Sequence, residues 1–134
     1  MISFFLQNGD VLFLGRGERN VASVFRNEFP AVLAQSYFTV MRLTDKRILP
    51  EYLAAFLNHP ATQTKIRQMA SQTTIRSVPA SEIGQLTINV LPLATQHKIV
   101  EIVNLQRVAE DIETQIEKKR QGLIEYKLQL FLTH

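Results

Sequence analysis

The sequence predicts an α+β fold in which a small mixed sheet with short helices is followed by one long C-terminal coiled-coil helix. Up to residue 93, short segments rich in β-branched and aromatic residues alternate with polar connections, a pattern typical of strands and turns. From residue 94 onward, apolar residues recur at helical spacing and no proline occurs. We therefore divide the chain into two predicted domains, 1–93 and 94–134.

The composition indicates a soluble globular protein and excludes several classes of site. The chain has 134 residues, of which 46% are hydrophobic and 20% charged, enough for one domain with its own core. The absence of cysteine excludes disulfides, thiolate nucleophiles and cysteine-ligated zinc, and it fits the reducing cytoplasm, where we expect the protein. No apolar run reaches the ~18 residues needed to span a bilayer, so we expect no membrane partner.

The net charge is +3, and its distribution along the chain is uneven. Met1–Leu93 contains nine lysines and arginines against six aspartates and glutamates, whereas Ala94–His134 contains six of each kind. The positive excess therefore lies in the first domain. Such an excess permits a polyanionic partner without requiring one.

The first domain is expected to contain strands and short helices in a definite order. An Asn8-Gly9 turn precedes a buried strand, and Gly15-Arg16-Gly17 ends that strand. Pro50 is tolerated in the first turn of a helix, and Pro92 stops the last strand. The predicted strands are 10–14, 21–25, 36–43 and 86–91, the predicted helices are 50–58 and 61–70, and 71–77 is a polar loop.

One helical pattern accounts for the chain beyond Leu93, with Thr95 as the expected N-cap. At ~1.5 Å per residue this helix would be ~55 Å long, which is too long for the core of a globule of this size. Lys119 at a d position, with Gly122 beside it, weakens the middle of this seam, and a lysine there can fix the register at a cost in stability. Heptad position a falls on Ile102, Ala109, Ile116, Leu123 and Leu130, and position d on Leu105, Ile112, Lys119 and Tyr126.

The heptad seam predicts that this helix packs against a second helix. The alternative is that the helix lies against its own domain, but that domain is too small to cover the whole stripe. We therefore expect the partner helix to come from another copy, giving a homodimer, or from another protein. The residues expected to form this interface are Ile102, Leu105, Ile112, Ile116, Leu123 and Leu130.

Polar clusters in the predicted loops of the first domain are the candidates for DNA contact. Arginine pairs with guanine in a bidentate manner and asparagine with adenine, while threonine reaches phosphates or a thymine methyl group. The simpler reading of such clusters is a solvated surface. The pair Gly15-x-Gly17 is no dinucleotide fingerprint, because Asn20 stands where the third glycine is needed. The candidate DNA-binding residues are Arg16, Arg19, Asn20, Thr73, Thr74 and Arg76.

Catalytic chemistry is not indicated, so we predict no catalytic residue, no metal ligand and no cofactor. The histidines His59, His97 and His134 have no metal-ligand spacing. Glu117 and Lys118 are similar to nuclease carboxylate–lysine groupings, but both lie on the polar side of the coiled-coil helix. A solvated face explains them better than an active site.

The order of these elements resembles the specificity (S) subunit of type I restriction–modification systems, namely the distal part of one target-recognition domain plus one spacer helix. The resemblance extends from about Leu6 to Phe131, and it depends on the order of its motifs rather than on any single motif. The matching motifs are the Gly9–Phe13 strand with its glycine-broken loop, Pro50–Asn58, Gln63, the polar Gln72–Arg76 loop with Val78-Pro79, and the Leu86–Ile102 segment with its Pro-Leu and Gln96-x-x-Ile-Val elements.

The resemblance implies a non-catalytic protein that reads DNA and offers its helix to methyltransferase subunits, which carry the chemistry and its cofactors. A complete S subunit has two such repeats, so we expect a shortened subunit here, 1–93 being a partial recognition domain. Two copies would then pair through antiparallel helices and favour a symmetric, two-part DNA site. The alternative is an assembly module that docks on a methyltransferase or on a full specificity subunit without binding DNA.

Overall fold

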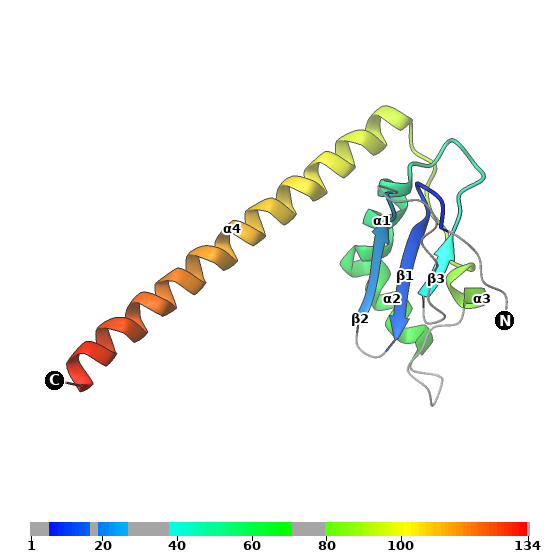
Figure 1. The fold of residues 1–134 in the computed structure, drawn as a ribbon. Helices are drawn as coiled ribbons and strands as arrows, with labels where there is room; N and C mark the ends of the chain where they lie inside the picture. Colours follow the sequence, from blue (N-terminus) through cyan, green and yellow to red (C-terminus); the bar gives the residue numbers. More distant parts are fainter. Residues whose placement is uncertain (1–5, 17–18, 27–37, 71–79, 134) are drawn as a thin grey trace. The chain divides into compact units, whose positions relative to one another are not determined.

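The computed structural model describes residues 6–16, 19–26, 38–70 and 80–133, with the backbone alone at 15, 16, 19, 20, 38, 70 and 80. The chain divides into two compact units, Met1–Val100 and Glu101–His134. The α+β fold class is confirmed (Figure 1). In chain order the elements are β1 (Val11–Arg16), β2 (Arg19–Val24), β3 (Phe38–Met41), α1 (Pro50–Asn58), α2 (Pro60–Ala70), α3 (Ala80–Ile83) and α4 (Leu93–Leu132).

The three strands form an antiparallel sheet in the order β2-β1-β3. The predicted turn at Asn8-Gly9 precedes β1, and Gly9 has a φ of 93°, a left-handed conformation that a side chain would disfavour. The register pairs Phe13 with both Ala22 and Thr39. Because side chains alternate across a strand, this register puts one apolar row of each strand on the same face.

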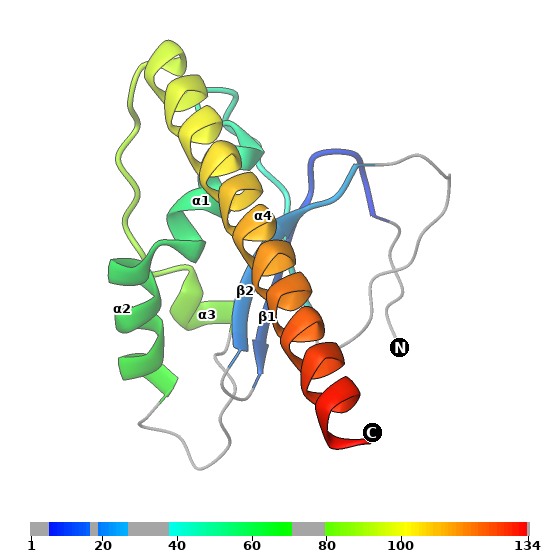
Figure 2. The same ribbon diagram turned by 90° about the vertical axis from the view of Figure 1, so that its left-hand side faces the viewer.

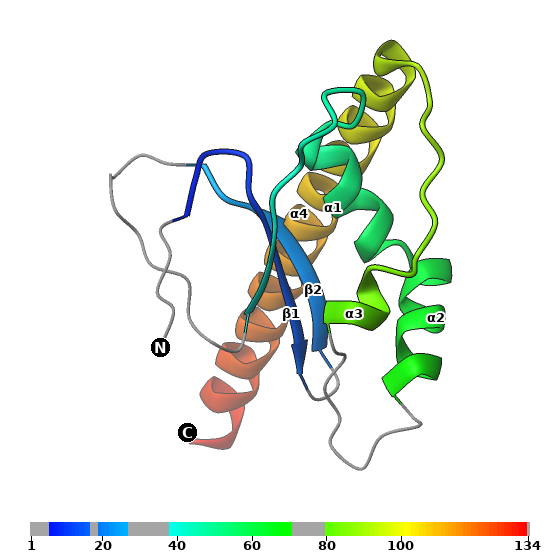
Figure 3. The same cartoon turned by 90° about the vertical axis from the view of Figure 1, so that its right-hand side faces the viewer.

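The helices of the first unit cover one face of this sheet (Figures 2 and 3). Side chains from β1, β2 and the three short helices meet there in one apolar cluster, and partly buried residues such as Val24 and Met41 pack around it. Burial of apolar surface stabilises a fold by ~25 cal/mol per Å². We therefore regard this cluster as the main source of stability for the unit. The buried members of the cluster are Val11, Phe13, Ala22, Ala54, Leu57, Ile66 and Ile83.

Helices α1 and α2 form where the sequence predicts them, with one proline in the first turn of each. Proline has no backbone N–H, and in the first turn of a helix such a group would have no acceptor within the helix. The fixed φ of Pro50 also suits the first turn. His59 ends α1 and its Nδ1 accepts the N–H of Ala61 at 3.2 Å, so this side chain also caps the start of α2. The Asn58-His59-Pro60 segment thus separates two helices without a longer loop.

Three local predictions are wrong. Strand β1 runs through Gly15 to Arg16, so the glycines do not end it at Leu14. Thr95 is not the N-cap of α4, because the helix already begins at Leu93 and the carbonyl of Pro92 accepts the N–H groups of Thr95 and Gln96. The segment 86–91 is not a strand, and the short helix α3 was not predicted at all.

An ion pair between buried Asp10 and half-exposed Arg42 joins the start of β1 to the end of β3. Asp10 is 1% exposed and accepts hydrogen bonds from Arg42 Nε and Nη2, both at 2.9 Å, and from the N–H of Gln7 at 2.7 Å. The Arg42 hydrogen bonds hold the pKa of the Asp10 carboxyl below its ordinary value, against the opposing effect of burial. The charged form of Asp10 is therefore the one that the fold stabilises.

This ion pair predicts a specific loss of stability in acid. Because the pKa of Asp10 is lower in the folded state, its contribution is fully present above the ordinary aspartate pKa, near 4. That contribution is lost as the pH falls through the lower folded pKa. Urea unfolding between pH 6 and pH 2 should therefore show that the free energy of unfolding falls as the pH falls. In Asp10→Asn this free energy should fall less steeply with pH.

Asp45 provides the matched control for this experiment. Its hydrogen bonds with Arg47 lower its pKa to about 2, but both residues lie at the surface and only two positions apart. Such a local pair can also form in the unfolded chain, so Asp45→Asn should leave the acid slope unchanged. Equal slopes for Asp10→Asn and the unmodified protein would contradict the assignment.

The outer edge of strand β2 is held by a side chain of α1. The Asn58 amide donates to the carbonyl of Ala22, and its Oδ1 accepts the N–H of the same residue, both at 2.8 Å. Ala22 is the middle of the strand and pairs with Phe13 in the neighbouring strand. The clamp therefore fixes α1 to the sheet by hydrogen bonds as well as by apolar packing.

Candidate helix-pairing and nucleic-acid interfaces

The first turns of α4 belong to the first unit and contain a buried polar side chain, Gln96. Gln96 is fully buried, and its Oε1 accepts the N–H of Leu49 at 2.9 Å. Its Nε2 donates to the carbonyls of Arg47, at 2.7 Å, and Leu91, at 2.8 Å. The amide thus satisfies three backbone groups of the segments that lead into α1 and α4. In the sequence, Gln96 is recognisable only as part of the Gln96-x-x-Ile-Val motif, which does not indicate this structural role.

The predicted apolar seam lies on one uninterrupted helix. Helix α4 runs through forty residues, from Leu93 to Leu132, and every described residue from 101 to 133 is exposed. The six predicted interface residues keep between 44% and 63% of their surface in contact with solvent. A helix with such a stripe is normally stabilised by packing of its apolar face. These residues are Ile102, Leu105, Ile112, Ile116, Leu123 and Leu130.

The middle of the seam contains one charged residue and one small residue among its large apolar residues. Lys119 occupies a d position, and Ala109 is the smallest residue at any a position. A lysine can lie in such a seam only where its methylene chain is covered and its ammonium group reaches water or a carboxylate. The seam therefore restricts which partner surfaces can lie opposite Lys119.

The charges of α4 are divided between its two halves. Glu101–Glu117 contains five acidic residues and one arginine, whereas Lys118–His134 contains four basic residues and one glutamate. Within the helix, Arg120 Nη1 contacts Glu117 Oε2 at 3.1 Å, but both side chains are more than half exposed, so this pair adds little stability. The division gives the helix an acidic and a basic half, with opposite charges available to a partner.

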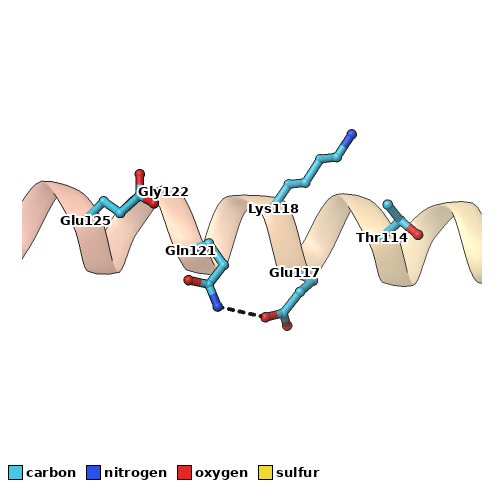
Figure 4. A pocket seen from close by; sticks show the side chains of 6 residues that line it. All are labelled: Thr114, Glu117, Lys118, Gln121, Gly122 and Glu125. Atoms are coloured by element: carbon cyan, nitrogen blue, oxygen red, sulfur yellow. Dashed lines mark hydrogen bonds between the residues drawn. The ribbon is translucent and has the colours of Figure 1, made fainter.

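A shallow depression lies on the side of α4 away from the seam, where Gly122 leaves a gap between longer side chains (Figure 4). A Cβ atom added to Gly122 would meet no atom within 4 Å. Gln121 donates from Nε2 to Glu117 Oε1 at 3.2 Å across this surface. Glu117 and Lys118 are part of this solvated face, and the described residues contain no group of three or more potential metal ligands.

The structure brings together only part of the predicted DNA-binding set. Arg16 ends β1 and Arg19 begins β2, and the two residues are paired across the end of this hairpin. Asn20 is paired with Gly15 one position further along. The predicted loop here is thus mostly strand. The other three candidates, Thr73, Thr74 and Arg76, lie outside the described residues.

No helix in the described part of the chain is long and apolar enough to cross a membrane. Helix α4 has the length, but its charged residues are spread over both halves. Large apolar residues occupy most of its a and d positions from Ile102 to Leu130, the pattern expected for helix–helix packing, and others such as Val108 and Ile124 lie outside that seam.

Comparison with known protein families identifies the chain. Residues 2–125 match the family model of the type I restriction modification DNA specificity domain. A comparison with curated proteins finds no significant match. The family model covers both the sheet-containing unit and most of α4, in agreement with the resemblance seen in the sequence. Its members are DNA recognition domains without catalytic activity of their own. The chain belongs to the type I restriction modification DNA specificity domain family.

Proposed function

We propose that the chain is a DNA sequence-specificity module in which the domain 1–93 contacts double-stranded DNA. The helical domain 94–134 pairs with a second copy and offers a docking surface to a methyltransferase subunit, in the cytoplasm. The observation that carries this proposal is the exposed apolar seam of α4 in a chain of the DNA specificity family. The chemistry of modification belongs to the methyltransferase partner.

Pairing with a second copy is supported by the extent of the seam. The large apolar residues at heptad positions recur from Ile102 to Leu130, and each is exposed. A continuous exposed stripe of this kind marks an interaction surface, whereas single exposed apolar residues are ordinary. A second copy supplies an identical stripe of the same length.

The antiparallel orientation is supported by Lys119 and by the division of charge. In a parallel, in-register pair each residue lies beside its own copy, so two Lys119 ammonium groups would meet in the seam. The acidic halves would also lie together, as would the basic halves. Antiparallel pairing avoids both repulsions, because it places Glu101–Glu117 of one copy beside Lys118–His134 of the other.

DNA binding by the first domain is supported by family membership and by charge. The domain 1–93 carries the positive excess of the chain. The hairpin end contributes Arg16, Arg19 and Asn20, whose backbone positions lie next to each other. Two copies related by a two-fold axis would present two such surfaces, which favours a DNA site with two symmetric halves.

The direct test is fluorescence anisotropy of the purified protein with a randomised duplex pool, titrated with salt. A working recognition module should enrich particular sequences, and the salt dependence should report its phosphate contacts. Arg76→Ala should weaken binding to the enriched sequence by about tenfold, the effect of losing ~1–3 kcal/mol of base contact. Arg107→Ala, on the outer face of α4, removes the same charge and should change affinity far less.

Failure of this test would favour the alternative function. If no duplex binds, even with methyltransferase present, the chain acts as an assembly module that docks through α4. If Arg76→Ala and Arg107→Ala behave alike, Arg76 makes no base contact, although the recognition proposal itself would stand on the enrichment result.

A further inference from the structure

We propose that Lys119 fixes the register of the paired helices by lying opposite Ala109 of the second copy. The two-fold axis of the dimer then passes beside Thr114. This inference deepens the proposed function, because it rests on the pairing of two copies through α4. It determines how far the helices overlap, and therefore the separation between the two DNA-reading units.

In an antiparallel pair, a positions of one helix lie opposite d positions of the other, so the possible registers differ by steps of seven residues. With the axis at Thr114, each seam position between Ile102 and Tyr126 faces another seam position. The apolar centre consists of Ile112 and Ile116 from both copies, and the facing pairs are Ile102 with Tyr126, Leu105 with Leu123, Ala109 with Lys119, and Ile112 with Ile116.

This register suits the size and charge of Lys119. Ala109 leaves room for the four methylene groups of the lysine, whose ammonium group can then extend to the edge of the seam. The basic segment Lys118–Arg120 lies level with residues 108–110 of the second copy, next to its acidic residues Glu110, Asp111 and Glu113. Both copies make this contact, since the axis relates them.

Shifting the helices by one heptad toward their N-terminal ends removes apolar contacts. The axis would then lie between residues 110 and 111, and the C-terminal part of each seam would face the polar first turns of α4 or the segment before it. Two large seam residues would lose seam partners, because Leu123 would face Lys98 and Tyr126 would face Thr95.

Shifting by one heptad in the other direction brings the lysines together. Lys119 of each copy would then face Ile116 of the other copy, next to the two-fold axis. The large Ile116 would thus replace the small Ala109 as the neighbour of Lys119. The two lysine positions would be separated along the axis by about 4.5 Å, three residues of helical rise. Two ammonium groups so close in an apolar seam repel each other strongly. Lys119 therefore opposes this shift, and the loss of apolar contacts opposes the shift in the other direction.

The register can be measured with spin labels, because the chain has no cysteine and each introduced cysteine is unique. Arg107, Thr114 and Gln121 all occupy heptad position f, on the outside of the pair. With the axis at Thr114, labels at 107 and at 121 are each displaced along the axis by about 21 Å, and labels at 114 by almost nothing. Double electron–electron resonance should therefore give equal distances at 107 and 121 and a shorter one at 114.

Every other arrangement gives a different pattern. A one-heptad slip lengthens the axial displacement at one of the outer positions by about 10 Å and shortens it at the other by the same amount. A parallel pair gives the same distance at all three positions. Unequal values at 107 and 121 would overturn the register while leaving the homodimer intact. Absence of any intermolecular distance would overturn the proposed pairing itself.

The role of Lys119 is tested by comparison with its neighbour. Lys119→Leu should tighten the dimer at least tenfold and should add slipped registers, seen as additional distances for labels at 107 and 121. Lys118→Leu removes the same charge at heptad position c, outside the seam, and should leave the distances unchanged. A single, unchanged set of distances in Lys119→Leu would show that another residue fixes the register.

Discussion

Replacing both Ile112 and Ile116 by glutamate is expected to convert the dimer into a monomer. In the proposed register these residues form the centre of the seam, and the two-fold axis doubles each substitution. Loss of buried isoleucine contacts costs 2–5 kcal/mol per site, and the carboxylates must also be desolvated or leave the seam. A loss of at least ~5 kcal/mol raises the dissociation constant of the dimer more than roughly a thousandfold.

Sedimentation equilibrium over a range of concentrations measures this change directly. The matched control is the double variant Thr114→Glu and Gln121→Glu, which adds the same charge at the outer f positions of the same helix. The control should remain dimeric. A persistent dimer in the Ile112→Glu, Ile116→Glu protein would place the interface outside the seam. The helical signal of the monomer should also fall, since an isolated helix loses its packing partner.

The second large effect is expected for Gln96→Met, which keeps the length of the side chain and removes its amide. Three backbone groups would lose their partners, the N–H of Leu49 and the carbonyls of Arg47 and Leu91. An unsatisfied buried group costs about 1–3 kcal/mol, and because these three hydrogen bonds are only part-buried, we expect a combined loss of about 3 kcal/mol. That is a large share of the 5–15 kcal/mol typical of a whole domain.

Chemical denaturation followed by the near-ultraviolet signal of the first unit measures this loss, because Tyr52 is buried there. Gln121→Met is the control, since it makes the same substitution on the exposed face of α4. If Gln96→Met were as stable as the control, water or a shifted carbonyl would have to replace the amide. Solvent access at Gln96 would then be greater than its complete burial indicates.

Local patterns in the sequence predicted most of the elements. Helix α4 carries a heptad pattern from Ile102 to Leu130 and contains no proline, and α1 begins at a proline suited to its first turn. Both signals depend on neighbouring residues only. The seam of α4 could be predicted residue by residue for the same reason, because a heptad pattern specifies which side chains share one face.

The segment 86–91 shows where local patterns fail. Its β-branched residues Ile88 and Val90 favour an extended backbone, and no strand is present there. A strand also needs a neighbouring strand to which its backbone can hydrogen-bond. The backbone of this segment instead bonds to a side chain of α1 and to the end of α3. The Tyr52 hydroxyl donates to the carbonyl of Asn89, and the N–H of Leu86 bonds to the carbonyl of Ile83. The β-propensity of single residues therefore did not indicate with which groups the backbone of this segment forms hydrogen bonds.

The roles of Gln96 and Asn58 could not be predicted, because their partners are distant in sequence. Gln96 bonds to Leu49 and Arg47, and Asn58 bonds to Ala22 across thirty-six residues. Polar residues on helices usually face solvent. One signal was available, since Gln96 is three positions from both Leu93 and Ile99 and so shares their helix face. The candidate DNA-binding residues have no comparable periodicity from which they could be predicted.

The clamp on Ala22 also bears on whether the protein stays in solution. Strand β2 is at the margin of its sheet, where unpaired N–H and carbonyl groups can recruit a strand from another molecule and begin aggregation. The Asn58 amide imitates the peptide group of such an incoming strand and already occupies both groups of Ala22. An added strand would have to displace that amide at the centre of the exposed margin. The clamp thus protects the β2 margin of the sheet from strand addition, while the apolar seam of α4 stays exposed for pairing.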